Sequence, residues 1–186
     1  RMGSTIVALG NNLATTEAEI VEFGLRIAGA GKLAGLTEAQ IFSIGGAMSS
    51  VGVAAEAGGT SVQKVLNKMT EAVARGGADL NTFAKTAGMS SEEFSRAFRE
   101  DAGESFTLFV EGIKEQGEGA FATLENLSLS NERVIRAFMG LAGAGDLLRT
   151  SMETGQTAWI ENTAMAEEAQ QRYDTFASKV QVLKNI

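Results

Sequence analysis

The sequence contains no proline, no histidine and no cysteine in 186 residues. Without histidine there is no imidazole to act as a base near neutral pH, and without cysteine there is no thiolate nucleophile. The same absences remove the usual ligands of zinc and iron sites. The composition therefore excludes most catalytic classes, and we expect a protein that is not an enzyme and holds no cofactor and no metal.

Aromatic residues are also scarce, at 6% of the chain, and alanine supplies much of the 44% apolar share. Alanine favours helices but buries little surface, so we expect a core that is shallow for the length of the chain. The 16 basic residues are outnumbered by 23 acidic ones, for a net charge of −7. Affinity for a nucleic-acid backbone comes from clustered Lys and Arg, so we expect no direct nucleic-acid binding.

Long hydrophobic runs are missing as well. The longest uncharged stretch, residues 39–55, is interrupted by Gln40 and three serines and is too short and polar to span a bilayer. The N-terminus carries no apolar segment with a cleavage site, so a signal peptide is not expected. Helical patterns reach both ends, at residues 4–9 and 164–186, which predicts a segment cut from a longer protein.

What the chain has in abundance is glycine, with 22 residues placed between amphipathic stretches and often before a Ser or Thr. Residues 16–19 (TEAE) and 37–40 (TEAQ) have the form of capping boxes, and residues 90–93 (SSEE) open another helix. We expect Gly29 to Gly31 to end the first of these helices, and Asp79 to cap a short one. No alternating strand pattern and no Asn-Gly or Asp-Gly turn occurs.

These patterns predict an all-α fold. We expect roughly eight to ten short amphipathic helices, and because short helices are marginal alone they should pack as a compact domain. The division we predict is a helical core region at residues 1–163, followed at 164–186 by the start of a longer, more charged helix that leads into the rest of the parent protein.

Small residues recur every four positions at Gly46, Ser50, Ala54 and Gly58. On one continuous helix they would form a stripe that lets a second helix approach closely. Alternatively, the glycines and serines mark a helix break near Gly58, since each glycine costs a helix about 1 kcal/mol. The sequence leaves both interpretations open.

The apolar faces supply the candidate core. The most aromatic face carries Phe106, Phe109, Val110 and Ile113, and a second face carries Val134, Phe138 and Leu141. Their helical spacing predicts that they pack inside the domain. Trp159 and Tyr173 are too isolated to form a stacking platform, and we expect them to be core or interface anchors.

Motifs for catalysis or nucleotide binding are incomplete. Residues 29–32 (GAGK) suggest a phosphate loop, but Arg26 stands where a P-loop needs glycine, and Leu33 where it needs a hydroxyl. The looser dinucleotide pattern has no preceding strand. Adjacent acids such as Glu92 and Glu93 are typical of helix starts rather than of a hydrolase site.

Several stretches in order along the chain carry a resemblance to a known family. They are residues 15–20 (TTEAEI), 26–31 (RIAGAG), 34–37 (AGLT), 53–60 (VAAEAGGT), 83–94 (FAKTAGMSSEEF) and 141–148 (LAGAGDLL). Together they resemble the core region of tail tape measure proteins of long-tailed phages. These stretches are caps, turns and packing positions, and none of them is a catalytic constellation.

The resemblance implies a structural function in the virion, inside the tail tube or at the tail tip, after assembly in the host cytoplasm. Tape measure proteins are long and mostly helical, and tail tube subunits polymerise around them so that their length sets the tail length. The resemblance further implies tail tube and tail tip proteins and tail assembly chaperones as partners, and a homo-oligomer of a few copies, about three. It also implies departure from the tube ahead of the DNA during genome ejection.

Two other functions remain as alternatives. A membrane-active segment could form a passage for DNA, with residues 41–55 inserting and making transient contact with the host membrane. A cell-wall hydrolase is the third candidate, since some members of the family carry such domains elsewhere. We find no residues here that would support that activity.

Overall fold

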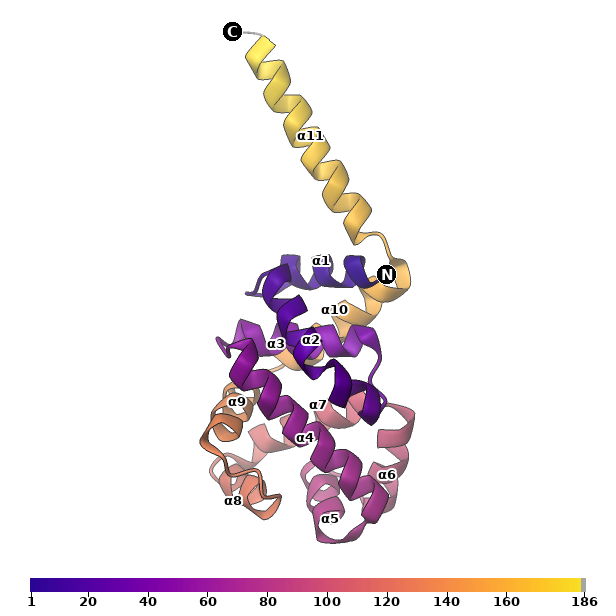
Figure 1. Ribbon diagram of the computed structural model, residues 1–186, viewed down its shortest axis with the longest axis vertical. Helices are drawn as coiled ribbons and strands as arrows, with labels where there is room; N and C mark the ends of the chain where they lie inside the picture. Colours follow the sequence, from indigo (N-terminus) through magenta and orange to yellow (C-terminus); the bar gives the residue numbers. More distant parts are fainter. Residues whose placement is uncertain (185–186) are drawn as a thin grey trace.

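The computed structural model describes the backbone of residues 1–184 and the side chains of residues 1–173 and 175 (Figure 1). Within that range the regular structure is entirely helical, so the all-α prediction is confirmed. The helices are α1 (Met2–Asn12), α2 (Glu17–Ala34), α3 (Glu38–Ser50), α4 (Ala55–Arg75), α5 (Gly77–Thr86), α6 (Ser91–Glu100), α7 (Ala102–Gln116), α8 (Gly119–Asn126), α9 (Glu132–Gly143), α10 (Leu147–Glu161) and α11 (Ala164–Lys184).

Reciprocal capping boxes begin three of these helices: the two predicted at residues 16–19 and 37–40, and a third at residues 90–93, where only a helix start was predicted. The Thr16 amide donates to the Glu19 carboxylate at the start of α2 (2.9 Å), and the Ser90 amide donates to Glu93 at the start of α6 (2.9 Å). At the start of α3 the acceptor is the Gln40 amide oxygen, 3.0 Å from the Thr37 amide. In each case the hydroxyl of the N-cap residue accepts a hydrogen bond from the backbone amide of the third helical residue. The amides of the N-cap and of the third residue, which have no partner within the helix, are therefore both hydrogen-bonded.

Two predicted helix ends are wrong. Residues 29–31 do not end α2, which continues to Ala34 and ends at Gly35 with a left-handed φ of +93°. Gly31 lies inside the helix, and the Ile41 side chain packs against it. A Cβ added at Gly31 would come within 2.9 Å of that side chain, so the close packing requires glycine at this position. Asp79 does not cap α5, which follows Gly76; its carboxylate instead pairs with Lys68 of α4 at 2.7 Å.

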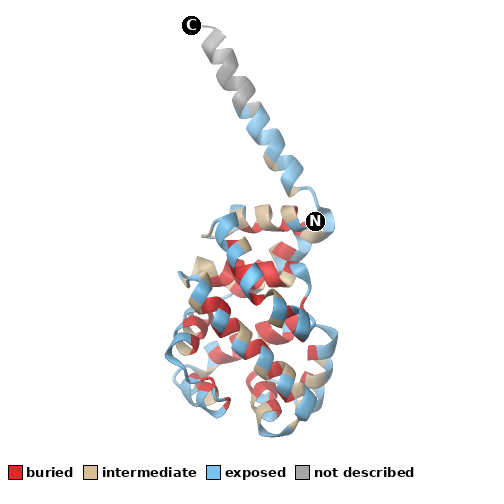
Figure 2. Cartoon of the chain, in the orientation of Figure 1, coloured by how far each residue is buried: buried red, intermediate tan, exposed pale blue. Residues whose placement is uncertain are grey.

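The helices enclose one main apolar cluster that runs from Phe23 in α2 to Leu148 in α10 (Figure 2). Its members lie far apart in the sequence, which makes the body a compact helical domain, as predicted. A second, smaller group of buried side chains consists of Leu9, Ile20 and Phe42. We call it the satellite cluster; the half-buried side chains of Ile6 and Leu13 pack against it.

The last described helix projects away from the body (Figure 1). It begins at Ala164, and its 21 residues equal the length of α4. Because residues 185–186 lie outside the described range, a C-terminal helix longer than the others stays a prediction. At its start α11 contacts α1, where the Asn11 side-chain amide donates to Glu168 (3.5 Å).

Candidate interaction surfaces

The small-residue stripe does not lie on one helix. Helix α3 ends at Ser50 and α4 begins at Ala55, so Gly46 and Ser50 belong to one helix and Gly58 to the next, with Ala54 as the N-cap between them. The chain turns at Gly52, whose φ is +75°, and the Val53 amide bonds back to the Met48 carbonyl at 3.2 Å. The continuous-helix interpretation is therefore wrong, and the break lies at residues 51–54 rather than near Gly58.

The stripe residues that are buried contact parts of the same chain. A Cβ at Gly58 would come within 2.5 Å of the Phe23 ring, and one at Gly46 within 3.0 Å of Leu13. The Ser50 hydroxyl donates to the Gly46 carbonyl at 2.7 Å. Gly46 and Gly58 thus allow close packing inside the domain, while Ala54 lies exposed on the surface.

A closer helix contact, which the sequence analysis missed, joins α3 to α10. The Ser151 hydroxyl donates to the Ser43 carbonyl (2.7 Å), and an added Cβ at Gly155 would collide with the Ser43 hydroxyl. Ser43 and Ser151 are both fully buried, and the Ser43 hydroxyl has no hydrogen-bond partner in the described part of the chain. The four-residue spacing of Ser151 and Gly155 was the available signal. We call this contact the α3–α10 seam.

The predicted aromatic faces lie in the main cluster. Phe106, Phe109 and Phe138 are fully buried, and the Phe138 ring packs edge-on against the other two with centroids 5.8 and 6.5 Å apart. Phe109 in turn packs edge-on against Phe83 at 5.0 Å. Such edge-to-face pairs add to the burial energy because the ring edge is attracted to the neighbouring π face.

Trp159 and Tyr173 lie outside that cluster. Trp159, on α10, is half-buried and belongs to neither group of buried apolar residues, and Tyr173, on α11, is 69% exposed. The core interpretation is wrong for both. Helix α10 presents Ala158 and Gly155 rather than Trp159 to the body, and Tyr173 lies on α11, which projects away from the body. The interface interpretation stays a prediction.

An ion-pair cluster joins α10 to α7. The Arg149 guanidinium donates to Glu111 (2.7 and 3.0 Å) and to Glu104 (3.1 and 3.3 Å). These hydrogen bonds, first those to Glu111 and then those to Glu104, raise the pKa of Arg149 above its usual value. Because the guanidinium donates its hydrogen bonds to Glu104 and Glu111 of the same chain, the cluster links α10 to α7 and leaves Arg149 little capacity to bind an anion.

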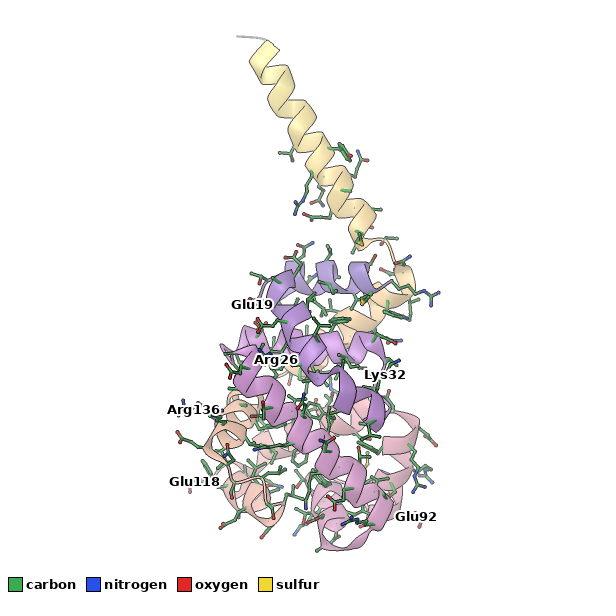
Figure 3. The ribbon with its side chains drawn as sticks, viewed as in Figure 1. Glu19, Arg26, Lys32, Glu92, Glu118 and Arg136 are labelled. Carbon is green, nitrogen blue, oxygen red and sulfur yellow. The ribbon has the colours of Figure 1, made fainter. Side chains whose placement is uncertain are left out.

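Charges on the outside of the body are mixed in sign. The exposed charged side chains labelled in Figure 3 are Glu19, Arg26, Lys32, Glu92, Glu118 and Arg136. Several basic side chains pair with a neighbouring acid, as Arg136 does with Glu132 one helical turn away. Such interspersed surface charge favours solubility and gives little attraction for a partner of one sign.

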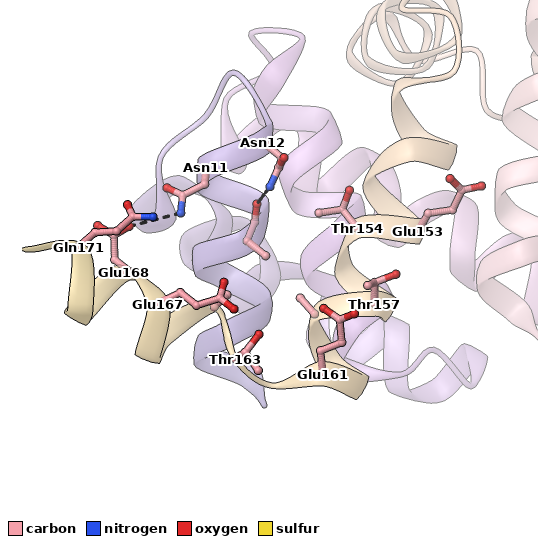
Figure 4. A pocket seen from close by; sticks show the side chains of 13 residues that line it. Asn11, Asn12, Glu153, Thr154, Thr157, Glu161, Thr163, Glu167, Glu168 and Gln171 are labelled. Atoms are coloured by element: carbon pink, nitrogen blue, oxygen red, sulfur yellow. Dashed lines mark hydrogen bonds between the residues drawn. The ribbon is translucent and has the colours of Figure 1, made fainter.

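Among the hollows on the surface of the described residues, two lie beside features discussed above. One, of about 430 Å³, lies between α1, α10 and the start of α11 and is lined by Glu153, Glu161, Glu167 and Glu168 (Figure 4). The pKa of Glu168 is lowered, mainly by a hydrogen bond from Arg172 and then by one from Asn11. The other, of about 600 Å³, lies between the α3–α4 connection and α9 and has a largely apolar lining with Arg133 and Arg136 beside it.

The described residues contain no group of three or more acidic, histidine or cysteine side chains placed to hold a metal ion. Over the same residues, no helix is both long enough and apolar enough to cross a bilayer. The stretch proposed for membrane insertion, residues 41–55, contributes α3, whose Ile41, Phe42 and Ile44 side chains are buried in the body.

Comparisons with known proteins add no relative. No protein-family model, no curated protein and no solved structure matches the chain.

Proposed function

We propose that this chain is a structural segment of a phage tail tape measure protein. The proposal is supported by the ordered series of resembling stretches, from residues 15–20 to residues 141–148. It is also supported by the kind of contacts that the body makes, which are helix caps, close glycine contacts and buried rings. Nothing in this arrangement requires a substrate or a cofactor.

The main apolar cluster supports a folded segment rather than an extended one. A ruler made of one extended helix of this length would span about 280 Å at 1.5 Å per residue. Here Phe23, Phe83, Phe109 and Phe138 meet in one core instead, so the chain is folded back on itself several times. We infer a folded module attached to the ruler, or a folded storage form of a segment that later extends.

The partners of this module would be tail tube and tail tip proteins, tail assembly chaperones and a few further copies of the chain. The large apolar side chains that are exposed in the described part of the chain are the candidate contact points: Met2, Leu25, Leu33, Phe121 and Ile160 on the body, and Met165 and Tyr173 on α11. Phenylalanine, tyrosine and methionine, which make up four of these seven, are enriched at the cores of protein interfaces. The segment would reside in the tail tube or at the tail tip and leave during genome ejection.

Electron microscopy of tails from virions that lack this segment in frame tests the proposal. Tails shortened by about 280 Å would identify an extended ruler, at the rise of one helix. Tails of unchanged length would identify a folded module outside the measured span, and loss of tails would identify a function in initiating assembly. An in-frame deletion of equal length in a neighbouring part of the parent gene is the control.

Mass spectrometry of purified wild-type virions is the companion measurement. Peptides from this segment should be present in purified tails. Virions that lack these peptides, together with normal tails and infectivity after the deletion, would refute a structural function in the tail.

A further inference from the structure

The first helix is attached to the body in a different way from the other helices. Helix α1 lies across α10, α3 and α2 at the end of the body from which α11 departs (Figures 1 and 2). Its one fully buried large apolar side chain, Leu9, belongs to the satellite cluster with Ile20 and Phe42, and not to the main cluster. The buried apolar contacts that hold α1 therefore belong to the satellite cluster and not to the main cluster.

The remaining buried face of α1 is polar. Ser4 and Thr5 are buried, with the Ser4 hydroxyl donating to the Asn162 side chain at 3.2 Å and the Thr5 hydroxyl to the Gly155 carbonyl at 3.5 Å. Both distances are at the long end of the range for such bonds, and hydroxyls released from them would find water instead. These contacts fix the position of α1 but contribute little net free energy to holding it there.

The surface beneath α1 is small compared with the main cluster. It includes the Gly155 carbonyl of the seam, which accepts from Thr5, and the satellite-cluster side chains of Ile20 and Phe42. Exposing these two apolar side chains costs less than exposing the many side chains of the main cluster, because the cost scales with the apolar area uncovered.

From this geometry we propose that α1 is a detachable strap. It undocks from α10, α3, α2 and the start of α11 as a unit while the main cluster stays packed, and its release uncovers Gly155 of the seam and the rest of the satellite cluster. Local openings of this kind are drawn from elements that bury few apolar contacts. The proposal does not depend on any function in a phage tail, and it is tested on the purified chain.

The absence of native cysteine allows a direct test with single-cysteine variants. Ser4→Cys places the probe on α1, and Ser61→Cys on α4 and Ser105→Cys on α7 are matched controls. All three serines are buried to the same degree, at 2%, 1% and 0% exposure. The measurement is the rate at which each thiol reacts with Ellman's reagent, in buffer and at urea concentrations below the unfolding transition.

If α1 opens locally, the thiol at position 4 should react on the order of 100-fold faster than those at positions 61 and 105. Its rate should also change little with urea, because a local opening exposes little surface, whereas the control rates should rise steeply. Equal rates with equal urea dependence at all three positions would mean that α1 opens only when the whole body unfolds, and the proposal would be wrong.

Hydrogen exchange of the unmodified chain covers the case in which Ser4→Cys itself loosens α1. The Leu9 amide should exchange faster than the Val65 and Phe109 amides, again with a smaller dependence on urea. Equal protection of all three amides would overturn the proposal independently of any substitution.

Discussion

Gly112, in the interior of α7, is the position where the packing of this fold can be tested most sharply. A Cβ at Gly112 would collide with the backbone carbonyl oxygen of Thr86 and come within 2.7 Å of its carbonyl carbon. Because the obstacle is backbone, no side-chain rotation relieves it, and the end of α5 must move away from α7. That movement also disturbs the hydrogen bond from the Gln116 side chain to the Thr86 hydroxyl (3.2 Å).

The expected effect of Gly112→Ala is the difference between two opposing terms. Overpacking at a close contact costs about 1–3 kcal/mol, with the upper value expected for a backbone obstacle. Alanine in place of glycine inside a helix stabilises the folded state by about 1 kcal/mol. We therefore expect a net destabilisation of about 2 kcal/mol, which for a chain of this size lowers the melting temperature by about 4–8 °C.

Gly140→Ala is the matched control, because Gly140 is also inside a helix, α9, but has no atom within 4 Å of its Cβ position. There only the helix-propensity term acts, so this variant should be stabilised by about 1 kcal/mol. Urea unfolding followed by far-ultraviolet circular dichroism measures both variants. Stabilisation of the Gly112 variant to the same extent as the Gly140 variant would refute the close approach of α5 and α7.

Three further measurements test other parts of the fold. Phe109→Ala should cost about 3–5 kcal/mol of unfolding free energy, whereas the half-exposed Phe121→Ala should cost under about 0.5 kcal/mol; equal losses would contradict the described core. Arg149→Met should cost about 0.5–1 kcal/mol, less at high salt, and the same change at the exposed Arg136 nearly nothing. Hydrogen bonds from the Ser90 hydroxyl and amide lower the pKa of Glu93 from 4.5, so this interaction stabilises the fold above that pH and is lost as the pH falls through the lowered pKa. Glu93→Gln, which keeps a side-chain acceptor as Gln40 does, should flatten this part of the acid destabilisation between pH 7 and pH 3; an unchanged pH dependence would contradict the capping box.

Features that depend on a few neighbouring residues could be predicted from the sequence. The capping boxes at Thr16 and Thr37 and the helix start at Ser90 lie where the residues indicate, because a cap is complete within four positions. The apolar spacing that places Phe106 and Phe109 on one face of α7 is equally local.

Features that depend on a distant partner could not be predicted. Residues 29–31 look like a helix end, yet the glycine at 31 is retained inside α2 because Ile41 fills the space beside it. The stripe from Gly46 to Gly58 looks continuous, yet the chain turns at Gly52 so that α4 can pack along α2. In each case the glycine pattern is compatible with a continuous helix and with a helix end, and the packing of distant residues determines which one forms.

The helical class, the starts of α2, α3 and α6 and the apolar face of α7 could be predicted because they follow from hydrogen bonds and periodicities within one or two turns. Which helices meet depends on packing between distant parts of the chain. The tertiary structure joins Ser43 of α3 to Ser151 and Gly155 of α10, more than 100 positions further along the chain. The spacing of Ser151 and Gly155 indicates a face of small residues on α10, but it does not identify the partner helix. The tertiary structure also separates the buried apolar contacts of α1 from the main core, because burial is shared among all the helices and no single stretch of sequence specifies it.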